Sequence, residues 1–128
     1  MIFVNLPVDD LDKARGFFSE LGFTFNADFT DEKATCMVVG DQAFVMMLTR
    51  PFFATFSAKP VAGPEVTQCA VGLSADSRVE VDDLVERALA LGAAPAGPPQ
   101  DEGFMYGRSF HDLDGHLWEF IWMDPAAA

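Results

Sequence analysis

The chain has 128 residues and a formal net charge of −12, from 8 basic and 20 acidic side chains. Half of its residues are hydrophobic and 13 are phenylalanine, so we expect a packed globule and not a disordered acidic chain. Because lysine and arginine form no cluster, neither nucleic acid nor an anionic membrane surface is an expected partner.

The first segment, "MIFVNLPVDDLDK", lacks a basic leader, and its apolar run meets two aspartates too early for a signal peptide or a membrane-spanning helix. The two cysteines, Cys36 and Cys69, sit in apolar runs where reduced thiols are common. We therefore expect a cytoplasmic protein without a disulfide.

The first 49 residues predict a strand, a helix and three further strands. "IFVNLPV" is strand-like, and apolar residues then recur at helical spacing from Leu11 to Leu21, after an acidic start and before Gly22. The runs "FTFNADF", "ATCMVVG" and "QAFVMMLT" follow, separated by turn residues. Residues 1–49 thus form a predicted β-α-β-β-β module.

The pattern restarts after residues 50–65, which contain three prolines and no clean period and are predicted to be a connector. "VTQCAVGLSAD" is strand-like, and Ser77 with Glu80 forms a capping box at the start of a helix. A short extended piece near residue 95, then "GFMYGRSF", "DLDG" and "HLWEFIWM", complete a second β-α-β-β-β module over residues 66–124.

A single module of this kind covers one face of its sheet with a helix and leaves the other face bare. Two modules can curve their bare faces toward each other and enclose a cleft. The sequence therefore predicts one α+β domain over residues 1–128, in which two tandem βαβββ modules form a half-barrel cleft that holds the functional site.

The chain resembles the vicinal oxygen chelate superfamily, which includes glyoxalase I, bleomycin-resistance proteins and extradiol dioxygenases. The resemblance rests on "VDDLDKARGFFSELGF", on the duplicated module order, and on "DLDGHLWEF" near the end. It implies that metal-dependent relatives hold a divalent ion on side chains from both modules. At the four aligned positions this chain has Phe3, Met47, Ala70 and Glu119.

One carboxylate is too few ligands for a transition metal, which needs three or four nitrogen or oxygen donors from the protein. A two-residue shift in register would bring only the amides of Asn5 or Gln68 inward. We therefore expect no metal and no other cofactor in the cleft.

Glu119 is the one charged residue in the apolar run "LWEFIWM", and a buried carboxylate needs a partner. If "DLDG" is a four-residue hairpin loop, Arg108 lies directly opposite Glu119, with Tyr106 on the same face of the sheet. An Arg108–Glu119 ion pair is then expected. It could either stiffen the sheet or supply the polar points of a ligand pocket.

In the second case the residues expected to bind a ligand are Phe3, Asn5, Met47, Tyr106, Arg108 and Glu119. Val45 and Phe52 or Phe53 would add to the walls. Trp118 and Trp122 have the opposite parity to Glu119 and are expected to pack under a helix. His111 and His116 border the turn and are expected to be exposed.

Three functions remain open from the sequence. The first is a binding protein that resembles bleomycin-resistance proteins and sequesters a small, cationic ligand without chemistry. The second is a lyase or isomerase that resembles glyoxalase (lactoylglutathione lyase), with Glu119 as the catalytic base and Tyr106 or Arg108 stabilising an enediolate. The third is a noncatalytic scaffold. A homodimer is expected under all three.

Overall fold

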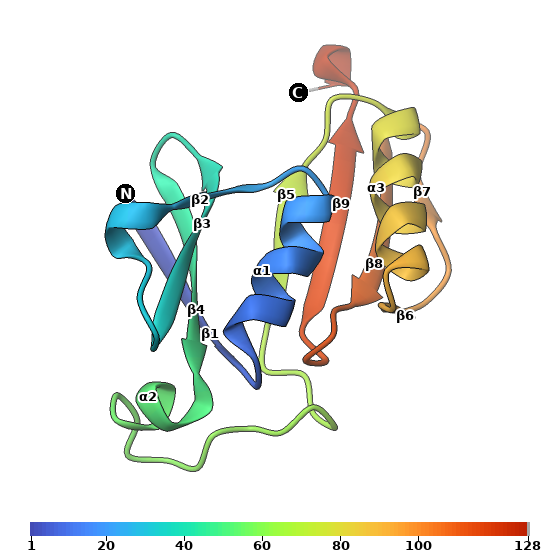
Figure 1. Cartoon of the computed structure of the whole chain (residues 1–128). Coiled ribbons are helices and arrows are strands. Elements are labelled where there is room, and N and C mark those ends of the chain that lie inside the picture. Colours follow the sequence, from blue (N-terminus) through green and yellow to red (C-terminus); the bar gives the residue numbers. More distant parts are fainter. Residues whose placement is uncertain (128) are drawn as a thin grey trace. The chain divides into compact units, whose positions relative to one another are not determined.

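The computed structural model describes residues 1–127 and divides the chain into two compact units, Met1–Gly63 (unit 1) and the part from Pro64 onward (unit 2). Each unit contains one sheet and one long helix (Figure 1). The predicted α+β class is thus confirmed. The cleft expected between the modules stays a prediction, and the pocket described below lies within unit 2.

Unit 1 has the predicted βαβββ order. Its elements are β1 (Ile2–Val8), α1 (Leu11–Glu20), β2 (Thr24–Asn26), a 3₁₀ turn (Ala27–Phe29), β3 (Ala34–Gly40), β4 (Ala43–Thr49) and α2 (Arg50–Ala54). The strand order in the sheet is β1-β4-β3-β2, in which β1 and β4 run parallel and the other pairs are antiparallel. The connection from β1 to the parallel strand β4 contains α1, β2 and β3, and α1 packs against β2, β3 and β4.

The short helix α2 differs from the prediction, because residues 50–65 were expected to be an irregular connector. Pro51 occupies its first turn, where a missing backbone N–H costs nothing, so the proline is compatible with a helix there. Arg50 donates to Asp9 at 2.7 Å and to the Ala62 carbonyl at 3.1 Å, which ties the segment to unit 1.

The ends of α1 follow the sequence signals. The Asp10 carboxylate accepts a hydrogen bond from the Lys13 amide at 3.1 Å, and Gly22 ends the helix at a φ of +101°. The helix buries Ala14, Phe17 and Phe18, and burial of such apolar side chains is the main stabilising term for a helix of this length.

Unit 2 repeats this plan. Its elements are β5 (Ala70–Ser74), α3 (Arg78–Ala90), β6 (Ala94–Pro95), β7 (Gln100–Asp101), β8 (Met105–His111), β9 (Leu117–Met123) and a 3₁₀ turn (Pro125–Ala127). The strand order is β5-β9-β8-β6, with β7 also paired to β8. β5 and β9 are parallel, as β1 and β4 are in unit 1. No helix within residues 1–127 is both long and apolar enough to cross a membrane.

Helix α3 covers one face of the second sheet. Its N-cap is Ser77, whose hydroxyl accepts from the Glu80 amide at 3.0 Å, while the Glu80 carboxylate accepts from the Asp76 amide at 3.2 Å. The predicted capping box is therefore present, with its return bond one residue earlier than usual. The helix buries Val81, Val85 and Ala88, and the buried strand residues of unit 2 include Phe110, Trp118 and Phe120.

Candidate functional site

The hairpin that joins β8 to β9 decides which side chains of unit 2 share a face. Its loop has three residues, 113–115, because the Asp112 amide donates to the His116 carbonyl at 2.9 Å. The Gly115 amide also donates to the Asp112 carbonyl at 3.0 Å, and Gly115 has a φ of +84°. This is a turn closed by a left-handed glycine, one residue shorter than the loop that we predicted.

The shorter loop shifts the β8–β9 register by one residue. Ser109 lies opposite Glu119, and Arg108 lies opposite Phe120. Because directly paired residues share a face and neighbours in a strand alternate, the shift moves Arg108 and Tyr106 to the face opposite Glu119. The predicted Arg108–Glu119 ion pair is therefore wrong.

The polar groups of Tyr106 and Arg108 face helix α3. The Tyr106 hydroxyl donates to Asp82 at 2.6 Å, and Arg108 donates to Asp82 at 3.1 Å and to Glu86 at 2.8 Å. The hydrogen bond from Tyr106, followed by that from Arg108, lowers the pKa of the Asp82 carboxyl. These two side chains fix the helix on its sheet.

The other face of the sheet carries a pocket of about 230 Å³. Its lining residues all belong to unit 2: Ala96, Gly97, Pro98, Gln100, Met105, Gly107, Arg108, Ser109, Leu117, Glu119 and Ile121. The lining combines apolar side chains, such as those of Leu117 and Ile121, with nearly as much polar surface, to which Gln100, Arg108, Ser109 and Glu119 contribute.

Glu119 is the carboxylate of this pocket. It is half-buried, and within residues 1–127 no hydrogen bond or ion pair reaches it. Gly72, its neighbour on β5, leaves the carboxylate unobstructed: a Cβ at residue 72 would lie 3.8 Å from Oε2. The Ser109 hydroxyl, across the ladder, donates to the Ala96 carbonyl at 3.5 Å. The Glu119 carboxylate therefore has no direct charge partner among the described residues, although Arg108, which pairs with Asp82 and Glu86, also lines the pocket.

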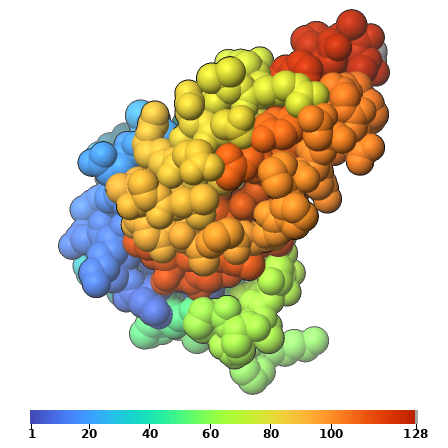
Figure 2. Space-filling view, turned by 90° about the vertical axis from the view of Figure 1, so that its right-hand side faces the viewer, coloured from blue at the N-terminus to red at the C-terminus, as the bar shows by residue number. Residues whose placement is uncertain are grey.

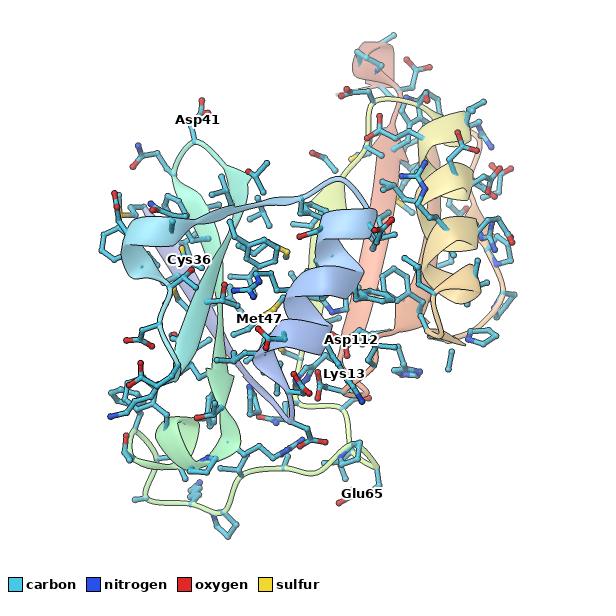
Figure 3. The ribbon with its side chains drawn as sticks, in the orientation of Figure 1. Lys13, Cys36, Asp41, Met47, Glu65 and Asp112 are labelled. Atoms are coloured by element: carbon cyan, nitrogen blue, oxygen red, sulfur yellow. The ribbon has the colours of Figure 1, made fainter. Side chains whose placement is uncertain are left out.

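In unit 1 the predicted residues fall on two faces. Phe3 and Asn5 lie on an exposed face, where Phe3 is 48% exposed and stacks on Phe44 at 5.2 Å. Met47 is 1% exposed and lies on the opposite face of the sheet, toward α1 (Figure 3). The prediction that Met47 shares a pocket wall with Phe3 and Asn5 is wrong.

The parallel register of β1 and β4 explains the difference. Asn5 pairs with Met46, so Met46 is the β4 residue on the exposed face. Val45, another predicted wall residue, is 1% exposed and shares the face of Met47. Local sequence does not reveal how β1 and β4 align, because a helix and two other strands lie between them in the chain.

The prediction that Trp118 and Trp122 pack under a helix is confirmed, whereas the prediction that His111 and His116 are exposed is wrong, because both are half-buried. The buried Trp118 indole donates to Asp112 at 2.8 Å, and Trp122 lies under the Arg78 guanidinium, 5.1 Å from it. His111 is half-buried and pairs with Leu117, so it shares the face of Glu119.

Of the eleven residues that line the pocket, the predicted site contained only Arg108 and Glu119. Gln100 and Ser109 are the polar residues that sequence reasoning missed. The glycine in "DLDG" was the available signal for Ser109, since a left-handed glycine is typical of a three-residue hairpin loop. Ile121 was correctly expected on the face of Glu119, because the two lie two residues apart on one strand. No comparable signal marked Gln100, which lies in a two-residue strand.

The side chains around Glu119 do not fit a transition metal. Its neighbours on the same face are Gly72, Ser109, Leu117 and Ile121, which offer a single hydroxyl as a further donor. Across residues 1–127 no group of three or more histidine, cysteine, aspartate or glutamate side chains is placed to hold an ion. Glu119 and its neighbours therefore supply too few ligands for a metal-dependent mechanism.

Comparisons with known proteins agree with this fold. A family model described as bleomycin resistance protein-like N-terminal matches residues 1–40, and no curated protein matches the chain. A solved structure of a hypothetical protein from S. aureus is 30% identical, with a TM-score of 0.83 and coverage of 95% of this chain and 92% of that chain.

Two more distant structures share the fold. A glyoxalase/bleomycin resistance protein/dioxygenase family enzyme from Burkholderia phytofirmans is 16% identical, with a TM-score of 0.78 and coverage of 94% and 96% of the two chains. The fosfomycin resistance protein FosX from Mesorhizobium loti is also 16% identical, with a TM-score of 0.70 and coverage of 99% and 94%. With its duplicated βαβββ modules and these matches, the chain belongs to the vicinal oxygen chelate superfamily.

Proposed function

We propose that the protein binds a small organic cation in the pocket of unit 2, with Glu119 as the recognition carboxylate and without a transition metal. The observation that carries this proposal is the half-buried Glu119 carboxylate, which lies beside the apolar side chains of Leu117 and Ile121 and has no partner within residues 1–127. A carboxylate partly withdrawn from water without a partner is unfavourable, and a cationic ligand supplies that partner.

The charge and size of the site support the same class of ligand. The net charge of −12 attracts cations and repels anions over the whole surface. A volume of about 230 Å³ is smaller than that of most drug-sized sites. The ligand, or the part of it that enters this pocket, is therefore a small group with an apolar body and a positive charge.

Binding without chemistry is favoured over a glyoxalase-like reaction. In that reaction Glu119 would act as a base, and Tyr106 or Arg108 would stabilise an enediolate. Both of these side chains are instead occupied by Asp82 on helix α3. The bleomycin-resistance description of the matching family model is in keeping with a binding role.

Three ring compounds of nearly equal size test the proposal: benzamidinium is a cation, benzamide is neutral and benzoate is an anion. We expect calorimetry to show benzamidinium binding best, with its affinity reduced about tenfold, or about 1.4 kcal/mol, in Glu119→Gln. The matched control is Glu20→Gln, which removes the same charge at an exposed position of α1. Equal binding of all three compounds, or an unchanged affinity in Glu119→Gln, would contradict the proposal.

The absence of a functional metal is also part of the proposal. We expect Ni²⁺ and Zn²⁺ to leave the melting temperature and the benzamidinium affinity unchanged at low micromolar concentrations. Stoichiometric metal binding that is lost in Glu119→Gln would overturn this part.

We further propose that the protein is a homodimer, as the superfamily resemblance implies. Sedimentation velocity measures this directly, and a single species of the monomer mass would contradict it.

A further inference from the structure

One wall of the pocket is a short segment between β6 and β8, residues 97–103, which we call the strap. It supplies Gly97, Pro98 and Gln100 to the pocket lining. Glycines with positive φ bound it, Gly97 at +127° and Gly103 at +82°. Such glycines let the chain turn sharply at both ends, so the strap is a distinct element that needs its own anchor.

The two residues of β7 point their side chains to opposite faces of the sheet. Gln100 pairs with Gly107 and Asp101 pairs with Tyr106 on β8. Because side chains alternate along a strand, Gln100 faces the pocket with Gly107, while Asp101 faces α3 with Tyr106. Whatever holds Asp101 therefore also sets the position of Gln100.

Asp101 is held by Arg78, the first residue of helix α3. The guanidinium donates to both carboxylate oxygens of Asp101, at 2.8 and 2.9 Å, and to the Gly103 carbonyl at 2.9 Å. It also lies over the Tyr106 and Trp122 rings, at 5.0 and 5.1 Å. A planar guanidinium suits these contacts together, since it donates in a fixed fork and stacks on aromatic rings.

The rest of the strap has few anchors. All of its residues are exposed, and apart from the Arg78 contacts it is held by the two β7–β8 pairs and by the Glu102 amide, which donates to the Met105 carbonyl at 2.9 Å. Few buried contacts make a segment locally unstable. Figure 2 shows this side of unit 2, where the yellow of α3 adjoins the orange of the segment that follows it. The Arg78 contacts join these two surface elements directly.

We propose that Arg78 is a positioning residue that holds the strap, and that Gln100, placed by it in the pocket wall, is a specificity-determining residue for the ligand. This rests on the proposed function, because the ligand would meet Glu119 and Gln100 in one pocket. The ligand class is thereby narrowed to cations that also carry a hydrogen-bonding group, since a primary amide both donates and accepts.

Hydrogen exchange tests the positioning role without any ligand. In Arg78→Met we expect the amides of residues 100–103 to exchange about tenfold faster, while the amides of Val85 and Ala88 in α3 keep their rates. Arg78→Lys keeps the positive charge but loses the forked guanidinium, so its strap amides should exchange at rates between those of wild type and Arg78→Met. Unchanged strap rates in both variants, or equal acceleration throughout unit 2, would overturn the positioning role.

The matched control is Arg15→Met. Arg15 also donates to an aspartate, Asp12, at 2.7 Å, but in unit 1 and outside the pocket lining. We expect this variant to leave strap exchange unchanged. Accelerated strap exchange in the control as well would mean that loss of any surface arginine pair has this effect, and it would overturn the specific role of Arg78.

A double-mutant cycle tests the role of Gln100, with benzamidinium as the probe. We expect Gln100→Ala and Arg78→Met each to lower the affinity severalfold, with the double variant no weaker than Gln100→Ala alone. If the two affinity losses add up in the double variant, or if Arg78→Met loses no affinity, then Arg78 does not act on the ligand through Gln100. If Glu119→Gln lowers the affinity while both of the other variants bind normally, the proposed function stands and this inference fails. If wild type binds no benzamidinium, the specificity role of Gln100 is overturned, and hydrogen exchange alone decides the positioning role.

Discussion

Ser109 lies directly opposite Glu119 in the β8–β9 ladder, and Arg108, one residue earlier, points to the other face. The sheet of unit 2 therefore separates two groups of polar residues. Tyr106 and Arg108 bind helix α3, whereas Glu119 lines the pocket without a partner within residues 1–127. One face of strands β8 and β9 thus packs against α3, and the opposite face carries Glu119 and the proposed ligand pocket.

Arg108→Met tests this separation. We expect it to lower the free energy of unfolding by about 1 kcal/mol, because Asp82 and Glu86 are partly exposed and such ion pairs are weakened by water. Arg108 is among the lining residues of the pocket, but its guanidinium is held by Asp82 and Glu86 on α3. Benzamidinium affinity should therefore change less than in Glu119→Gln. Urea unfolding of this variant measures the free energy of unfolding, and calorimetry measures its benzamidinium affinity. An affinity loss as large as that of Glu119→Gln would show that Arg108 serves the pocket.

Asp112→Ala should destabilise the β8–β9 hairpin strongly. The carboxylate, which Figure 3 labels at that end of the sheet, accepts from the Asp114 and His116 amides at 2.9 and 3.0 Å and from the Trp118 indole at 2.8 Å. Loss of the acceptor leaves a buried indole N–H unsatisfied, so we expect a cost of about 2–4 kcal/mol in urea unfolding.

The control for that measurement is Asp41→Ala at the exposed turn between β3 and β4 (Figure 3). Exposed turn substitutions usually change stability by less than about 0.5 kcal/mol. Equal losses in the two variants would contradict the structural role of Asp112.

Gly115→Ala should destabilise more than Gly103→Ala, although the two glycines have nearly the same φ, +84° and +82°. Both changes carry the strain of a left-handed residue, about 1–2 kcal/mol. At residue 115 the new Cβ would also lie 2.9 Å from the Pro64 Cβ, whereas at residue 103 nothing lies within 4 Å. The difference in melting temperature between the two variants measures the cost of the contact with Pro64. Equal melting temperatures would contradict this prediction.

The Arg78–Asp101 contact makes a prediction about acid titration. The hydrogen bonds from Arg78, and then the one from the Gly103 amide, lower the pKa of Asp101 from 3.8 to about 2. Because the folded pKa is depressed, the stability contributed by this pair is fully present above pH 3.8 and is lost as the pH falls through about 2.

Carboxyl NMR titration measures that pKa directly. We expect a midpoint near pH 2 for Asp101 in wild type and a return toward 3.8 in Arg78→Met. The same midpoint in both proteins would mean that Arg78 does not hold the carboxylate in solution.

The elements of the fold could be predicted because their signals are local. The cap residues Asp10 and Ser77 and the glycines that end the helices mark α1 and α3, and apolar runs mark the strands. The exceptions are α2, the two-residue strand β7 and the 3₁₀ turn Ala27–Phe29, which are too short to carry a periodic signal.

The site was predicted less well, because the face of a residue depends on strand register. A hairpin loop of three residues instead of four moved Arg108 away from Glu119. The parallel pairing of Asn5 with Met46 likewise placed Met47 on the covered face. Glu119 itself could be identified because a lone charge in an apolar run stands out wherever the register falls.

The most direct test of the account is a chemical-shift map of ¹⁵N-labelled protein titrated with benzamidinium. We predict that the largest amide shifts cluster at Gly72, Gln100, Ser109 and Glu119, and that Glu119→Gln abolishes them at the same ligand concentration. Shifts confined to unit 1, for instance at Phe3 and Asn5, or a map unchanged by Glu119→Gln, would contradict it.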